Sequence, residues 1–232
     1  MAMEITWSNF PDRFRAEAFH VFEWSRRRWR LVAAAAAAAA LVGAGLGVWM
    51  WRVERREGEA RIALAEINRA FRQQYPAGFY LPGGDGSEPK PDGIIQRYQQ
   101  LADGQAGTGA GLEARLRAGH LEYGAGTYDA AIRSYDRYLE GRRAPFRAVA
   151  LLGKGYALLA KGDAAGAVGA FGAAAEAAPR DAAAAEAYLA QGRALEGLKK
   201  TEEALRAYGL VTERFPQSAW ATQAADRVNA LK

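Results

Sequence analysis

The sequence of 232 residues lacks cysteine and contains only two histidines, His20 and His120. Without cysteine the chain can form no disulfide framework, carry no thiol nucleophile and bind no cysteine-ligated zinc. Two histidines are also too few for a multi-histidine metal centre. We therefore expect no metal site and no cofactor, and cysteine gives no indication of the redox compartment.

Signature motifs of enzymes are missing as well. The sequence contains no GxSxG, GxxxxGK[ST] or HExxH pattern, the arrangements that present a serine nucleophile, a phosphate-binding loop or a catalytic zinc ion. We assign no catalytic residues, and we expect that the protein is not an enzyme and has no small-molecule substrate. A hydrolase or enzyme accessory domain without a recognisable motif is the alternative.

Positively charged residues only slightly outnumber negatively charged ones. The chain has 31 lysines and arginines against 26 acidic residues, a formal net charge of +5. This excess is spread along the chain and makes no basic patch, so we expect no nucleic-acid partner. Half of the residues are hydrophobic and a quarter are charged, which suits a globular domain with a sizeable core.

One apolar run, LVAAAAAAAALVGAGLGVWMW at residues 31–51, contains no charged side chain. At about 1.5 Å per residue a helix of this length crosses a hydrocarbon core of roughly 30 Å, so we predict a transmembrane helix in a lipid bilayer. Tryptophans and arginines at its ends are the expected interface anchors: Trp29, Trp49, Trp51, Arg26, Arg27, Arg28 and Arg30. A cleaved signal peptide and a buried alanine-rich helix are the alternatives. The bulky end of the run disfavours the first of these.

The tail at residues 1–30 is aromatic and basic. Arginines flank the apolar run on both sides, but Arg13 and Arg15 add to those of the short tail. The distribution favours a cytoplasmic N-terminus. If the source is a Gram-negative bacterium, the C-terminal domain is then expected in the periplasm, on the cytoplasmic membrane of the bacterial cell envelope. The tail is expected to form an interfacial amphipathic helix, with a partner-docking tail as the alternative. Within the run, Gly43 and Gly47 are four residues apart and permit close packing against another transmembrane helix, or arise by chance in so alanine-rich a segment.

Beyond the run, residues 52–111 are expected to form a juxtamembrane helix, a loop rich in proline and glycine, and a short helix. Residues 112–216 then repeat a pattern of small and aromatic residues with a spacing of 36 or 37. Each copy reads as two helices joined by a short turn, and small residues of the first helix leave space for an aromatic ring of the second. The recurring sets are Gly119, Gly126, Ala131 and Tyr135; Gly155, Gly162, Ala167 and Phe171; and Gly192, Lys199, Ala204 and Tyr208.

These three copies resemble the tetratricopeptide repeat (TPR), a helix–turn–helix unit of about 34 residues. Together with the apolar run, the resemblance implies an all-α fold: an N-terminal transmembrane helix, a TPR-type solenoid of helical hairpins, and a capping helix at residues 217–232. The residue pattern of this last helix places Trp220, Ala224, Val228 and Leu231 on its buried face. Departures from the family pattern are Lys199 at a turn position usually held by glycine, and Arg115, Leu151 and Tyr188 at the position of an early tryptophan.

The resemblance also implies a protein-binding scaffold, with the first helix of each pair lining a groove for peptide segments of other proteins. The residues expected to face this groove are His120, Tyr123, Leu152, Tyr156, Leu159, Leu189, Arg193 and Glu196. For each leucine, plain packing between repeats is an equally good interpretation. His120 is more readily a structural residue or a peptide contact than a ligand or base, because the repeat region offers no second histidine.

The layout of tail, single span and repeat domain is similar to that of the ancillary subunits of the Sec translocon. That similarity implies a link between a translocon and periplasmic chaperones or client polypeptides. The alternative is a structural subunit of a larger membrane complex, assembled through the transmembrane helix and the N-terminal tail.

Overall fold

The computed structural model describes residues 28–75, 91–141 and 144–231. Within these ranges every regular element is an α-helix, and the chain divides into two compact units, with the boundary between Arg55 and Arg56. The all-helical class predicted from the repeat pattern is confirmed.

In the first unit, the alanine-rich run lies in α2 (Trp29–Gln74). Alanine and leucine favour helix, and no proline interrupts the segment. The run is exposed throughout, and α2 is the helix in the described ranges that is long and apolar enough to cross a membrane. The predicted continuation of the helix beyond the run is also present, because α2 extends without a break to Gln74.

In the second unit, residues 56–74 of α2 pack with α3 (Asp92–Gly104) and α4 (Gly109–Gly124). Their shared core contains Ala60, Leu64 and Ile67 from α2 beside Tyr98 from α3. The hydroxyl of Tyr98 donates a hydrogen bond of 2.6 Å to Asn68 Oδ1. The helices that precede the repeats along the chain are therefore joined to the first repeat by a continuous core.

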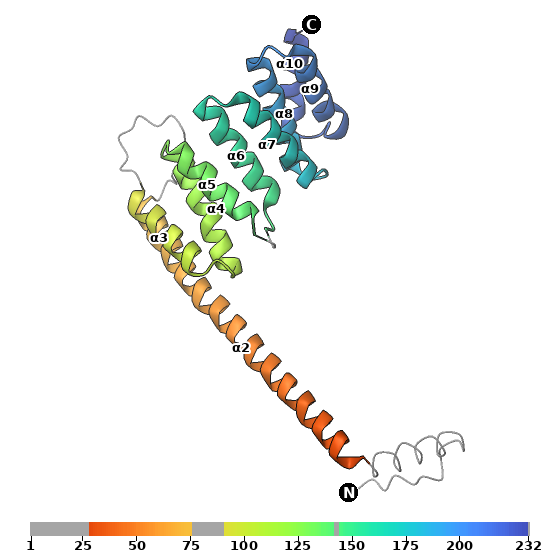
Figure 1. Ribbon diagram of the computed structural model, residues 1–232. Coiled ribbons are helices and arrows are strands. Elements are labelled where there is room, and N and C mark those ends of the chain that lie inside the picture. The colour runs from red at the N-terminus through yellow and green to blue at the C-terminus, as the bar shows by residue number, and fades with distance from the viewer. Residues whose placement is uncertain (1–27, 76–90, 142–143, 232) are drawn as a thin grey trace, which may run out of the picture. The chain divides into compact units, whose positions relative to one another are not determined.

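Six further helices complete the second unit, each packed against the one before it (Figure 1). They are α5 (Tyr128–Leu139), α6 (Arg147–Lys161), α7 (Ala164–Ala177), α8 (Ala182–Gly197), α9 (Thr201–Arg214) and α10 (Ala219–Leu231). The pairs α4–α5, α6–α7 and α8–α9 correspond to the three repeat copies. Contacts also join α4 to α6, α6 to α8 and α8 to α10, so the first helices of successive pairs are neighbours.

The predicted fit between glycines and aromatic rings is confirmed in all three pairs. A Cβ atom at Gly119 would lie 3.0 Å from Tyr135 Cε1, and one at Gly155 or Gly192 would overlap the ring of Phe171 or Tyr208. These rings are at most 1% exposed. Because glycine has no Cβ, each ring packs directly on the backbone of the preceding helix.

The turns between paired helices share a backbone conformation. Gly126 and Gly162 have φ values of 78° and 94°, and Lys199 occupies the corresponding turn with φ of 60°. Only glycine adopts this left-handed region without a steric cost. Lys199 therefore keeps the turn that the other two repeats form with glycine.

The last helix, α10, covers the end of the third pair. Ala221 and Ala224 are buried, and Trp220, Val228 and Leu231 pack against a core that includes Tyr208. The apolar face expected for a capping helix is thus the face that α10 buries. It shields apolar surface that would otherwise be exposed at the end of the array.

Candidate functional site

The candidate site is the face formed by the neighbouring helices α4, α6 and α8, which we call the α4–α6–α8 face. It carries the accessible side chains of Tyr123, Tyr156, Leu159, Arg193 and Glu196. Each lies on the first helix of a pair, where residues three or four apart fall on the same side of successive turns. The face is continuous because these helices contact one another directly.

Tyr156 connects two helices of this face. Its ring packs edge-on against Phe171 with centroids 5.1 Å apart, and its hydroxyl donates a hydrogen bond of 2.9 Å to Glu186 Oε1 on α8. Burial, followed by the nearby carboxylate of Glu186, raises the pKa of Tyr156. Tyr156 thus stays a neutral donor that fixes α6 against α8 and leaves only part of its ring accessible.

Two aromatic contacts occupy the α4 end of the face. Tyr123 is half-buried beside Tyr128, with ring centroids 5.9 Å apart, and burial raises its pKa. His120 packs against Tyr135 at 5.7 Å. Burial, with a smaller contribution from the Arg117 guanidinium, lowers the pKa of His120 to about 4. At neutral pH this imidazole is uncharged and belongs mainly to the packing of the first pair.

The leucines expected on the groove separate into two groups. Leu159 is 36% exposed, whereas Leu152 and Leu189 are buried within the cores of the second and third pairs. The exposed part of the face is therefore more aromatic and charged than the sequence suggested. We leave Leu152 and Leu189 out of the surface proposed to bind partners.

Polar contacts between α8 and α10 close the C-terminal end of the face. Arg193 Nη2 donates a hydrogen bond of 2.8 Å to Gln223 Oε1, and Glu196 accepts hydrogen bonds from Arg227 and the Tyr208 hydroxyl. The hydrogen bond from Arg227 is the main cause that lowers the pKa of Glu196. An open pocket of about 540 Å³ is lined here by Arg193, Glu196, Gly197 and Arg227.

Gln223 and Arg227 were missed by the sequence prediction. They are four residues apart on α10, at the edge of the helical face that carries Trp220 and Ala224. That spacing was the available signal. It could not show that this edge of α10 meets α8, because this depends on how the cap packs on the third pair.

The membrane anchors predicted in the first unit lie on exposed helical surface. Trp29, Trp49 and Trp51 are each more than half exposed, and the guanidinium of Arg30 lies 5.7 Å from the centre of the Trp29 ring. A Cβ atom at Gly43 or Gly47 would meet nothing within 4 Å. Arg28 is the residue just before α2, and Arg26 and Arg27 lie outside the described residues.

Comparison with known proteins supports the repeat interpretation. A family model described as the tetratricopeptide repeat matches residues 186–218, the region of α8 and α9. No curated protein matches the chain. A solved structure described as MamA 41-end from Desulfovibrio magneticus RS-1 is similar with a TM-score of 0.55 and 21% identity, covering 74% of this chain and 82% of that one.

A second structure, described as the MamA RS-1 ArsTM double mutant, has a TM-score of 0.52 and 21% identity, with 74% of this chain and 93% of that chain covered. At this level of identity the likeness is one of fold. Together with the matched repeat, it establishes a TPR-type solenoid.

Proposed function

We propose that this protein is a membrane-anchored scaffold whose TPR-type array binds segments of partner polypeptides. One observation carries the proposal: α4, α6 and α8 form a continuous face on which aromatic and charged side chains remain accessible. Tyrosine and arginine often dominate the energy of protein interfaces. Tyr123, Tyr156 and Arg193 are therefore the proposed main contacts, with Leu159 and Glu196 beside them.

The proposal includes a location. We propose that the exposed apolar part of α2 lies in the cytoplasmic membrane of a bacterium, with the N-terminus in the cytoplasm and the repeat domain in the periplasm. Support comes from the length and composition of the helix and from the additional arginines of the short tail. In this location the array would receive clients or chaperones beside the Sec translocon or another envelope machine.

Photocrosslinking in native membranes tests the binding face. Leu159 is the best position for the photoreactive residue, because its side chain is exposed and its replacement leaves the Tyr156–Glu186 bond intact. Arg206, exposed on the second helix of the third pair, is the matched control position. We expect polypeptides to be captured from Leu159 and not from Arg206. Equal capture from the two positions would contradict a binding face at α4–α6–α8.

A structural subunit of a larger membrane complex is the second candidate, and the four-residue spacing of Gly43 and Gly47 in the apolar run favours it. Leucine at both positions would block close helix packing. If the chain assembles through this helix, the double substitution releases it from its complex while Leu159 crosslinks persist. If the complex survives the double substitution, this alternative is wrong.

A further inference from the structure

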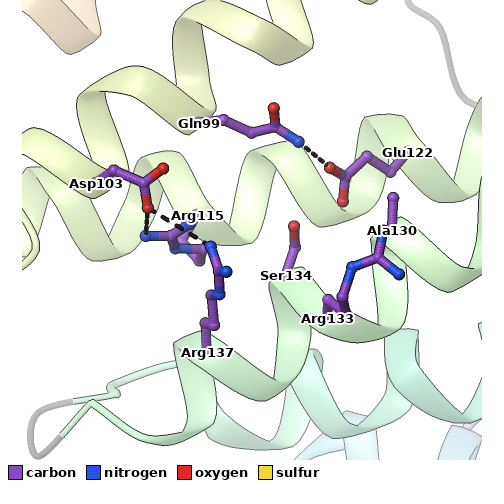
Figure 2. Close-up of a pocket in the computed structure, with 8 residues that line it drawn as sticks. All are labelled: Gln99, Asp103, Arg115, Glu122, Ala130, Arg133, Ser134 and Arg137. Atoms are coloured by element: carbon purple, nitrogen blue, oxygen red, sulfur yellow. Dashed lines mark hydrogen bonds and ion pairs between the residues drawn. The ribbon is translucent and has the colours of Figure 1, made fainter.

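A small polar pocket lies between α3 and α5, with α4 as its floor (Figure 2). Gln99 and Asp103 reach it from α3, and α5 contributes several polar side chains on the other side. Its cavity of about 150 Å³ has room for a group of a few heavy atoms. The lining residues are Gln99, Asp103, Arg115, Glu122, Ala130, Arg133, Ser134 and Arg137.

Glu122 at the floor of the pocket is only 2% exposed. One carboxyl oxygen, Oε1, accepts a hydrogen bond of 2.5 Å from Gln99 Nε2. The other, Oε2, is buried and forms no hydrogen bond within the described part of the chain, although the Ser134 hydroxyl lies close enough to oppose the rise of the carboxyl pKa. A buried polar atom without a partner costs about 1–3 kcal/mol, so this oxygen is an unfilled place for a hydrogen bond.

Three arginines surround this carboxyl group. Arg115, 8% exposed, donates a hydrogen bond of 2.7 Å to Asp103 Oδ1, and Arg137 lies 3.6 Å from the same oxygen. Arg133 has no carboxylate within 4 Å among the residues that the structure describes. Three guanidinium groups face two carboxyl groups, which leaves the pocket with an excess of positive charge.

The equivalent positions of the other repeats are apolar. Arg115 corresponds to Leu151 and Tyr188, and Glu122 corresponds to Leu158 and Leu195. Ser134 likewise corresponds to Ala170 and Ala207. The same helical packing is thus achieved twice without charge. Because burying charged groups is unfavourable, the polar set in the first pair is not explained by the needs of the fold.

We propose that this pocket binds a carboxylate group. The guanidinium of Arg133, with Arg115 and Arg137 beside it, supplies planar donors whose geometry matches a carboxylate. Glu122 in its protonated form donates a hydrogen bond from Oε2 to the same ligand, because two carboxyl groups in contact share one proton. The bound group would therefore satisfy both the unfilled place on Glu122 and the excess of positive charge.

This arrangement couples binding to proton uptake. Burial raises the pKa of Glu122, and a bound carboxylate raises it further. The charged groups that face Glu122 are Asp103 on α3, Arg115 on α4, and Arg133 and Arg137 on α5. The three arginines stay charged at all relevant pH values, so binding is expected to strengthen as the pH falls toward the ordinary pKa of Glu122.

The absence of cysteine allows a direct test on the full chain in detergent. Ala130→Cys places a single thiol at the edge of the pocket, and Ala165→Cys places one at an exposed position of α7. Iodoacetate and iodoacetamide both alkylate a thiolate with loss of iodide, but only iodoacetate carries a carboxylate. We expect the iodoacetate-to-iodoacetamide rate ratio to be about tenfold higher for the thiol at position 130 than for the thiol at position 165 in low salt. Dividing the two rates removes any difference in thiol pKa between the positions.

Variants on the Ala130→Cys background then assign the effect. Arg133→Gln should reduce the ratio toward the value of the Ala165→Cys protein. Arg206→Gln, the equivalent substitution in the third pair, should leave it unchanged. A pocket that serves only to pack helices gives equal ratios at positions 130 and 165, and that result would overturn the proposal, provided that the helical content of the variants is unchanged.

Protection of the Ala130→Cys thiol from iodoacetamide distinguishes two sources of the carboxylate. One arm uses acetate, and the other uses the peptide acetyl-Ala-Asp-Ala-amide with its Asn counterpart as control. Protection by acetate at the same concentration as the peptide indicates a free small carboxylate. Protection by the Asp peptide alone, at a concentration about tenfold lower or less, indicates an acidic side chain of a polypeptide. Protection by neither ligand at millimolar concentration counts against a carboxylate site.

Discussion

The first helical pair, α4–α5, and the two that follow it have the same packing but different chemistry. In all three a glycine of the first helix receives an aromatic ring of the second. Around that shared contact, the second and third pairs use leucine, tyrosine and alanine where the first pair has Arg115, Glu122 and Ser134. The comparison indicates that the repeat needs its glycine–ring contact, while neighbouring positions are free to carry charge and binding.

The largest effect is expected from breaking the shared contact. Phe171 is fully buried against Gly155, so Phe171→Ala should lower the free energy of unfolding by about 3–5 kcal/mol, through lost burial and the cavity left behind. Urea unfolding followed by circular dichroism measures this change. Phe146→Ala removes the same side chain from a position 54% exposed and serves as the control. A similar loss from both variants would mean that the ring contact is not special.

A second prediction concerns His120, whose equivalents in the other pairs are Tyr156 and Arg193. The pKa of His120 is lowered from 6.5 to about 4 in the folded protein, so the unfolded chain takes up a proton that the folded chain does not. The contribution of His120 to the free energy of unfolding is therefore fully present above pH 6.5. It is lost as the pH falls to about 4, which lowers stability by at most about 3 kcal/mol. His120→Gln should remove this part of the decline. An identical pH profile for the two proteins would show that the imidazole titrates normally.

A third prediction concerns replacing a charged residue of the first helical pair with the residue found at the equivalent position of the other two pairs. Glu122→Leu introduces the residue found at positions 158 and 195, and should raise the free energy of unfolding at pH 7 by about 1–2 kcal/mol. Burial raises the folded-state pKa of Glu122, so the folded chain holds more protons than the unfolded chain and stability falls as the pH rises from about 4.5. The increase in the free energy of unfolding caused by Glu122→Leu should therefore become larger as the pH rises from about 4.5.

The reverse exchange is the control for this prediction. Leu158→Glu places a carboxyl group in the second pair without the surrounding arginines and should destabilise the protein by about 3 kcal/mol. If Glu122→Leu lowers stability instead, the carboxyl group contributes to the packing of the first pair.

The features predicted from the sequence are those set by residues close together in one repeat. The fit of Gly119, Gly155 and Gly192 to aromatic rings and the buried face of α10 follow from spacing alone, because helical period fixes which side chains meet. Spacing alone could not show whether Leu152 and Leu189 are buried or exposed. Their burial depends on how closely neighbouring pairs pack.

The polar pocket illustrates the same limit. Arg115 and Glu122 are seven residues apart, on one side of α4, and that spacing was visible in the sequence. The packing of α3 against α4 was not, because the proline- and glycine-rich sequence between α2 and α3 interrupts the repeat pattern. Without α3 the third wall of the pocket is missing, and the two charged residues look like an ordinary departure from the repeat consensus.

The smallest effect is expected at the turn of the third pair. Lys199 has φ of 60°, whereas the corresponding turns use Gly126 and Gly162. The left-handed conformation costs a residue with a Cβ atom about 1–2 kcal/mol. Replacing lysine with glycine removes this cost, but part of the gain in stability is lost because the unfolded chain is more flexible at a glycine. Lys199→Gly should therefore raise the free energy of unfolding by about 0.5–1 kcal/mol in urea unfolding experiments. Gly162→Ala should lower it by at least as much, because the strain then appears where no compensation exists. If Lys199→Gly is instead destabilising, the lysine side chain makes a contribution larger than its backbone strain, and the third turn is not equivalent to the other two.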